Sequence, residues 1–141
     1  MAVCELKEQI EISVRFSEVD SMDVVWHGNY VKYLEDGREA FGKKHGIHYL
    51  DFMREGIAVP LVNIELEYKK PLKYNEKAIV EIKYVDCEAA KLIFEYTIYR
   101  SSNMDVVATA RSVQAFLNTK MELLLSFPDF FIQWKKRWLI K

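Results

Sequence analysis

The chain has 141 residues, half of them apolar, which fits one domain over residues 1–141 with enough apolar surface for a core without metal or disulfide support. Its 20 basic and 21 acidic side chains give a formal net charge of −1, so no strong positive field favours binding to a nucleic acid. No apolar run approaches the ~20 residues of a membrane-spanning helix, and the first residues lack a secretory signal pattern, so we expect a cytoplasmic protein.

Alternating apolar and polar residues over 10–16 predict the first strand, because successive side chains of a strand point to opposite faces. The period then changes to that of an amphipathic helix, which begins near Asn29, a candidate N-cap, and stops at Gly46. The apolar stripe of this helix consists of Tyr30, Tyr33, Leu34, Gly37 and Phe41. Gly37 lowers helix propensity by ~1 kcal/mol but would let a sheet approach closely.

A short helical segment over 48–54 follows the long helix. Alternation then predicts strands over 62–69, 80–84 and 92–98, each with one buried face. The fifth run, 106–117, is apolar on both faces and therefore fits a more deeply covered strand.

Residues 127–139 carry a second helical stripe, made of aromatic side chains. Pro128 fits the first turn of this helix, and the basic residues 135–137 suit the negative end of its dipole. Such a helix can lie on a membrane surface, but we favour packing against its own sheet or against a second subunit.

The order strand, long helix, four strands, short helix excludes a doubly wound sheet, which needs alternating strands and helices. It predicts an α+β fold in which one five-stranded antiparallel sheet is covered by a long helix and joined by a C-terminal helix. The other sheet face and the free edges still need cover, which favours an oligomer.

Several kinds of catalytic or binding site are disfavoured by the sequence. The three histidines, His27, His45 and His48, have no spacing that completes a metal site, so no metal is expected. The run G-x-x-x-x-G-K from Gly37 lacks the following hydroxyl and lies inside the helix pattern, where no phosphate loop can form. There is no G-x-S-x-G motif for a serine hydrolase. Cys4 and Cys87 are expected to be idle thiols.

The segment 17–28, just before the long helix, concentrates reactive side chains: three carboxylates, one imidazole and one indole. A helix N-terminus carries a partial positive charge and unpaired N–H groups, which makes it a ready oxyanion site. A carboxylate beside it stays ionised at neutral pH and can act as nucleophile or general base. On residue types alone, Asp20 and Asp23 serve equally well as residues that cap a turn.

Residues 15–30 resemble the signature of the 4-hydroxybenzoyl-CoA thioesterase family of hotdog-fold acyl-CoA thioesterases. The family pattern, Asp-x-x-Gly-x-Val followed shortly by Asn-Tyr and a helix, is matched by Asp20, Val25, Asn29 and Tyr30. Arg38 on the helix, and Lys69-Lys70-Pro71 with Tyr74 after the second strand, are also similar to the family.

The resemblance implies a long helix wrapped by an antiparallel sheet, and subunits that pair edge to edge as a homodimer or further as a homotetramer, with active sites at the interface. It implies hydrolysis of an acyl-CoA thioester to free acid and coenzyme A. Coenzyme A is then part of the substrate, and no separate cofactor is expected. Asp20 falls on the catalytic aspartate, and the backbone N–H at His27 falls on the group that polarises the thioester carbonyl, with its side chain assisting. Substrate contacts are expected at Trp26, Gly28, Tyr30, Lys69, Lys70 and Arg111.

Asp23 departs from the pattern because the family usually has glycine there. If that position needs a positive φ, aspartate tolerates it less freely than glycine, and a second carboxylate would raise the pKa of one of the pair. This departure favours one alternative, a non-catalytic module that binds acyl-CoA or an acyl carrier. His27 keeps a second alternative open, a hotdog dehydratase or isomerase that leaves the thioester intact.

Overall fold

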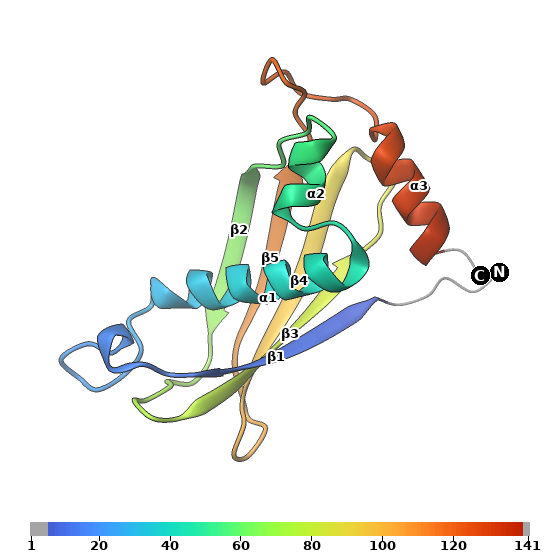
Figure 1. Ribbon diagram of the computed structural model, residues 1–141. Helices are drawn as coiled ribbons and strands as arrows, with labels where there is room; N and C mark the ends of the chain where they lie inside the picture. The colour runs from blue at the N-terminus through green and yellow to red at the C-terminus, as the bar shows by residue number, and fades with distance from the viewer. Residues whose placement is uncertain (1–5, 140–141) are drawn as a thin grey trace.

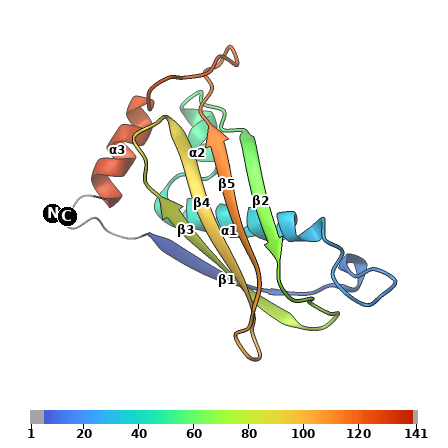
Figure 2. The ribbon, with the colours of Figure 1, turned by 180° about the vertical axis from the view of Figure 1, so that it is seen from behind.

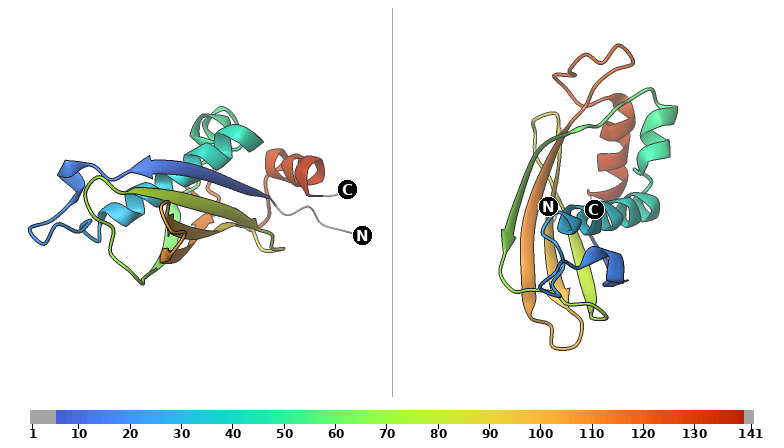
Figure 3. Two further views of the ribbon diagram at one scale, coloured as in Figure 1. Left: turned by 90° about the horizontal axis from the view of Figure 1, so that it is seen from below. Right: turned by 90° about the vertical axis from the view of Figure 1, so that its left-hand side faces the viewer.

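One antiparallel sheet organises residues 6–139, the part of the chain that the computed structural model describes. Across the sheet the strands are β1 (Lys7–Ser13), β3 (Lys77–Val85), β4 (Lys91–Arg100), β5 (Val106–Ala115) and β2 (Leu61–Tyr68). Every neighbouring pair is antiparallel. The helices described lie on one side of the sheet, as two layers in Figure 3, and Figure 2 shows the other face from behind. This is the predicted α+β architecture.

Helix α1 (Asn29–His45) lies across the sheet (Figure 1). The whole predicted apolar stripe is buried, and the helix ends at Gly46, whose φ of 78° is the left-handed conformation that glycine adopts freely. Gly37 is the point of closest approach: a Cβ added there would lie 2.5 Å from Cδ1 of Ile82 on β3. The missing side chain therefore sets the distance between α1 and the sheet.

The alternation in the central strands is confirmed. The side chains of β3 and β4 that face the helices are buried, namely Val80, Ile82, Tyr84, Leu92, Phe94, Tyr96 and Ile98. The first strand has the predicted length but begins and ends three residues earlier, at Lys7 and Ser13. Phe16 lies instead in a 3₁₀ turn, η1 (Phe16–Glu18), and is 76% exposed. The turn forms because the Glu18 carboxylate accepts the Arg15 N–H at 2.8 Å, a local bond that strand periodicity does not reveal. Likewise β5 stops at Ala115, two residues before the predicted end.

The two shorter helices complete the same layer. Helix α2 (Tyr49–Arg54) follows α1 directly and buries Phe52. Helix α3 (Asp129–Trp138) buries Phe131 and Trp134, and the Trp134 indole donates a hydrogen bond of 2.6 Å to the His45 carbonyl at the end of α1. The aromatic stripe of α3 therefore packs against its own core, as favoured.

Within residues 6–139, no helix is both long and apolar enough to cross a bilayer. Cys87 is a free thiol, and Cys4 lies outside the described residues.

Candidate active site

A tight turn between β1 and α1 holds Asp20. A bridge between Val19 and Val25 closes the turn, and the Asp20 N–H donates to the Val24 carbonyl at 2.8 Å. Inside it, Oδ1 of Asp20 accepts the Met22 N–H at 2.8 Å. Asp20 thus caps a turn, which is one of the two roles that its residue type allows. Its carboxylate is half-buried, and Oδ2 remains available as nucleophile or general base.

Asp23 occupies the last corner of this turn with a φ of 62°, and its N–H donates to the Asp20 carbonyl at 3.0 Å. The position therefore needs the left-handed conformation, as anticipated from the glycine in the family pattern. Aspartate is among the non-glycine residues that adopt this conformation most readily. The turn keeps its shape although glycine is absent.

Glu18 ties the turn to the first two turns of α1. Its backbone carbonyl accepts the Trp26 N–H at 2.9 Å and the Asn29 side-chain amide at 2.8 Å, and its carboxylate accepts the Tyr33 hydroxyl at 3.0 Å. Burial and this carboxylate raise the pKa of Tyr33, so the hydroxyl remains a donor. The N-cap of α1 is Gly28, so the prediction that Asn29 caps the helix is wrong. Asn29 is the first helical residue, and its buried side chain reaches across to the preceding loop.

The start of α1 presents free amides. Among the described residues, no atom accepts a hydrogen bond from the N–H of His27 or of Gly28. The next two amides are used: Asn29 N–H donates to Trp26 O and Tyr30 N–H to His27 O. A pair of unpaired amides at the positive end of a helix can bind a developing oxyanion. The pairing of Val19 with Val25 places Asp20 beside the segment that leads into this end.

Aromatic side chains surround the same helix start. The Trp26 ring lies over Gly28, where a Cβ would come within 2.1 Å of it, and its centroid is 4.8 Å from that of His27. The Tyr68 hydroxyl, at the end of β2, donates to the His27 carbonyl at 3.0 Å, and the Tyr30 ring packs edge-on against Tyr68 at 5.1 Å. Four predicted residues, Trp26, His27, Gly28 and Tyr30, thus gather at one place. Glu18, one of the carboxylates of the segment 17–28, and Tyr33, from the predicted helical stripe, join them. Tyr68 joins them without having been predicted.

The predicted basic contacts are spread more widely. Lys69 and Lys70 follow Tyr68 directly and are exposed. Lys69 forms an ion pair with Glu67 at 2.9 Å, and Lys70 forms one with Asp105 at 3.0 Å. Arg111 lies on the outer face of the sheet, level with acidic residues of β2 and β4, while its neighbours Ala110 and Ser112 face α1. Within one chain, Arg111 is therefore separated from Asp20 by the sheet.

The histidines do not assemble into a metal site. No group of three or more potential metal-ligating side chains occurs in residues 6–139. His45 is buried with Nδ1 3.0 Å from the Phe41 carbonyl, and His48 pairs with the Asp51 carboxylate at 2.6 Å.

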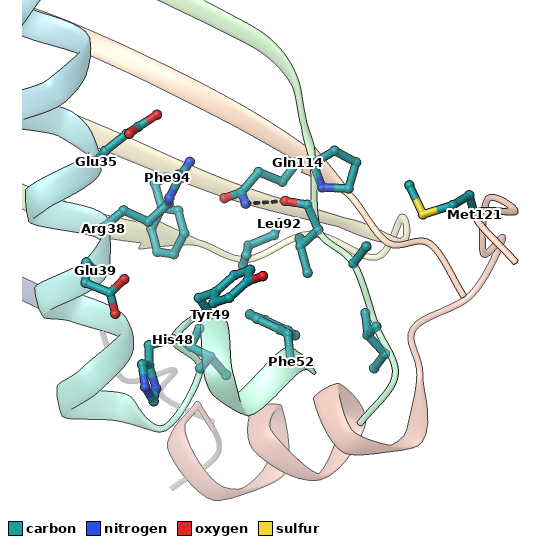
Figure 4. Close-up of a pocket in the computed structure, with 15 residues that line it drawn as sticks. Glu35, Arg38, Glu39, His48, Tyr49, Phe52, Leu92, Phe94, Gln114 and Met121 are labelled. Carbon is teal, nitrogen blue, oxygen red and sulfur yellow. Dashed lines mark hydrogen bonds between the residues drawn. The ribbon is translucent and has the colours of Figure 1, made fainter. Parts of the chain in front are cut away.

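A cavity of about 470 Å³, here called the α1–α2 cavity, opens where the second half of α1, helix α2, the segment before β2 and the ends of β4 and β5 meet (Figure 4). Its polar lining includes Glu39 and Arg38 from α1 and Gln114 from β5. The sequence analysis did not predict this cavity. One signal was present: Gln114 is a polar residue inside the otherwise apolar end of the 106–117 run.

Comparisons with known proteins give consistent results. A family profile described as the thioesterase-like superfamily matches residues 14–135. YneP of Bacillus subtilis (strain 168), provisionally named an acyl-CoA thioesterase, is 33% identical over 129 residues, which cover 89% of this chain and 94% of that protein. A chloroplast acyl-acyl carrier protein thioesterase of Arabidopsis thaliana is 26% identical over 79% of this chain and 59% of its own. The solved DHNA-CoA thioesterase of Staphylococcus aureus superposes with a TM-score of 0.82 at 25% identity, over 93% of this chain and 90% of that one.

Proposed function

Because the chain belongs to the thioesterase-like superfamily, we propose that it is an enzyme that hydrolyses acyl-CoA thioesters to the free acid and coenzyme A. The hotdog fold predicted from the sequence is confirmed by the sheet topology and by the superposition reported above. The narrower resemblance, to the 4-hydroxybenzoyl-CoA thioesterases, remains a prediction about the acyl group. The observation that carries the proposal is the pair of free amides at the start of α1 beside the turn that holds Asp20.

In the proposed reaction, the thioester oxygen accepts hydrogen bonds from the N–H groups of His27 and Gly28. The positive end of the helix then stabilises the negative charge that develops on this oxygen. Asp20 either attacks the carbonyl carbon or takes a proton from the water that attacks it, and the coenzyme A thiolate leaves. The exposed His27 imidazole assists at the same carbonyl. Loss of one such oxyanion donor typically lowers rates ~10²–10³-fold.

We propose further that two copies pair through β2, giving a homodimer that can associate further into a tetramer. β2 is an edge strand, and Leu61, Val62 and Tyr68 on it are 38%, 60% and 48% exposed. An edge strand with unpaired backbone groups and exposed apolar side chains is a template for another strand. The opposite edge, β1, exposes polar side chains on its outward positions and fits this role less well.

Antiparallel pairing of two β2 strands would join parts that lie apart in one chain. The start of α1 contacts Tyr68, the last residue of β2, whereas the α1–α2 cavity borders residues 58–60, just before its first residue. The first and last residues of β2 are roughly 25 Å apart along the strand. In an antiparallel pair, the last residue of one strand lies beside the first residue of the other. The Asp20 turn of one copy then faces the cavity of its partner.

The nucleotide part of coenzyme A would leave this site past the end of β2. Lys69 and Lys70 stand there with exposed ammonium groups, so we assign them to the phosphates. Arg111 can meet a phosphate only on the outer face of the sheet, from a nucleotide held by a further subunit. Trp26, Gly28 and Tyr30 would contact the thioester end.

The alternatives make different predictions. The departure at Asp23 favoured a module that only binds acyl-CoA, but the positive φ of Asp23 keeps the turn shape and removes that argument. A dehydratase or isomerase would modify the acyl chain and leave the thioester whole.

The experiment incubates the purified chain with a panel of acyl-CoA esters and acyl-carrier thioesters. A thiol reagent follows release of free thiol, and mass spectrometry follows the acyl product. Free thiol with an unchanged acid supports the proposal. Bound ester without turnover would overturn it in favour of a binding module, and an altered acyl group on an intact thioester would overturn it in favour of a dehydratase or isomerase.

A further inference from the structure

The Asp20 turn is attached to the segment that connects β2 to β3, residues 69–76, here called the β2–β3 link. The Val25 N–H donates a hydrogen bond of 2.8 Å to the Leu72 carbonyl in this link. The neighbouring Val24 forms a bridge with the next residue of the link. The position of the turn beside the start of α1 therefore depends on the position of the link.

One side chain, Arg100 at the end of β4, holds the link at two points. Its Nη2 donates a hydrogen bond of 2.6 Å to the Pro71 carbonyl, one residue before the carbonyl that is bonded to the turn. Its Nε lies 3.1 Å from Oε2 of Glu76, the last residue of the link. Oε1 of Glu76 accepts the Lys73 N–H at 2.7 Å, so this contact continues to the residue that pairs with Val24. Because Arg100 belongs to β4, these contacts fasten the link to the sheet.

A second carboxylate completes the surroundings of this guanidinium. Oδ2 of Asp105, in the hairpin between β4 and β5, lies 3.4 Å from Nη1 of Arg100. The hairpin and the β2–β3 link lie at the same end of the sheet (Figures 1 and 2). The Arg100 side chain is only 15% exposed, so solvent screens its ion pairs little, and its loss would leave two carboxylates without the cation between them. A planar guanidinium can bind three acceptors in fixed directions, whereas an ammonium group is a single point charge.

We propose that Arg100 is a positioning residue for the thioesterase reaction: acting through the β2–β3 link, it holds the Asp20 carboxylate in place relative to the free amides of α1. This inference rests on the proposed thioesterase function. Misplacement of a catalytic group by about 1 Å can lower a rate ~10²-fold, so we expect Arg100→Met to lower kcat about 10- to 100-fold. KM should stay within about 3-fold of the parent, because the ammonium groups assigned to the coenzyme A phosphates are retained.

A residue that only stabilises the fold would give a different result. Its loss would reduce the fraction of folded chains, whereas kcat per folded molecule would stay that of the parent. The test therefore measures kcat and KM on the best ester of the panel, at a temperature and urea concentration where circular dichroism shows the variant to be fully folded.

A second measurement follows the attachment of the turn directly. Amide hydrogen exchange, recorded by NMR, should be at least about 10-fold faster at Val25 in Arg100→Met than in the parent, because local opening exposes this N–H. Exchange at Ile82 in the central strand β3 should stay unchanged. Arg100→Lys keeps the charge without the planar fork, should show the same changes in kcat and exchange, and serves if Arg100→Met does not fold. Arg137→Met, the same chemical change at an exposed position of α3, is the matched control and should leave both measurements unchanged.

The two proposals can fail separately. A folded Arg100 variant with the kcat of the parent, or with unchanged exchange at Val25, overturns the inference about Arg100 and leaves the thioesterase proposal standing. If the parent chain hydrolyses no ester, the thioesterase proposal fails, and exchange at Val25 decides whether Arg100 positions the turn.

Discussion

Replacing Asp20 by asparagine would separate two roles of one side chain. Oδ1 accepts the Met22 N–H at 2.8 Å, and asparagine keeps a carbonyl oxygen at that place while it removes the charge. The turn should therefore survive, with a change in the free energy of unfolding within ~0.5 kcal/mol. The reaction should not survive, because neither a nucleophile nor a general base remains. We expect kcat/KM to fall ~10³-fold.

Asp20→Ala removes the acceptor as well as the charge. The Met22 N–H would then lose its hydrogen bond at an exposed place, which typically costs ~1 kcal/mol. For a chain of this length that is a fall of ~3 °C in Tm. The two variants should thus share the kinetic defect and differ in stability.

The assay follows release of coenzyme A with a thiol reagent on the best ester of the panel, and urea denaturation gives the free energy of unfolding. Asp23→Asn is the matched control: it removes a carboxylate from the same turn, and asparagine tolerates the positive φ at that position. Its activity should stay within about 5-fold of the parent, well short of the general-base effect. Asp20→Asn that keeps more than a tenth of the parent activity, or Asp23→Asn that is equally impaired, would refute the assigned role.

Three further predictions concern packing, protonation and assembly. Gly37→Ala should lower the free energy of unfolding by ~1 kcal/mol in urea titration, because the strain of a Cβ 2.5 Å from Ile82 outweighs the gain in helix propensity; a more stable variant would contradict this. Burial lowers the pKa of His45 below its ordinary 6.5, so the unfolded chain binds this proton first. Stability should therefore fall as pH drops below 6.5, by at most ~1.4 kcal/mol per pH unit. Between pH 7.5 and 5.5, the urea concentration at half unfolding should fall less for His45→Gln than for the parent. Equal falls in the two proteins would exclude this histidine as the cause. Val62→Lys on the β2 edge should convert a dimer to a monomer in light scattering, and a parent that is monomeric, or a variant that stays dimeric, would remove β2 as the interface.

Much of the fold follows from local patterns. The stripe from Tyr30 to Phe41 predicts α1 because side chains three and four residues apart share a helix face whatever surrounds them. The alternation in β3 and β4 is equally local, and both are confirmed. Gly37 was also identified in advance, since a glycine within an apolar stripe has few explanations other than close contact.

The predictions for the first strand and for the Asn29 cap failed because of hydrogen bonds that a periodic pattern does not show. Phe16 continues the alternation of the first strand, yet a single hydrogen bond from Arg15 to the Glu18 carboxylate diverts the chain before it. Asn29 fits a capping position, yet it is the first helical residue, and its side-chain amide donates to the Glu18 carbonyl, eleven residues away. Short polar bonds such as these are decided by which groups tertiary packing brings together.

The amino-acid sequence alone determined the α+β class, the order of the elements and the segment in which Asp20 precedes a helix, because backbone geometry imposes these periods residue by residue. Only the tertiary structure decided that the His27 and Gly28 amides stay unpaired, that Arg111 faces away from them, and that a cavity forms between α1 and α2. These features depend on which strand lies beside which and on how far α1 stands from the sheet, and such distances arise from contacts between residues far apart in the chain.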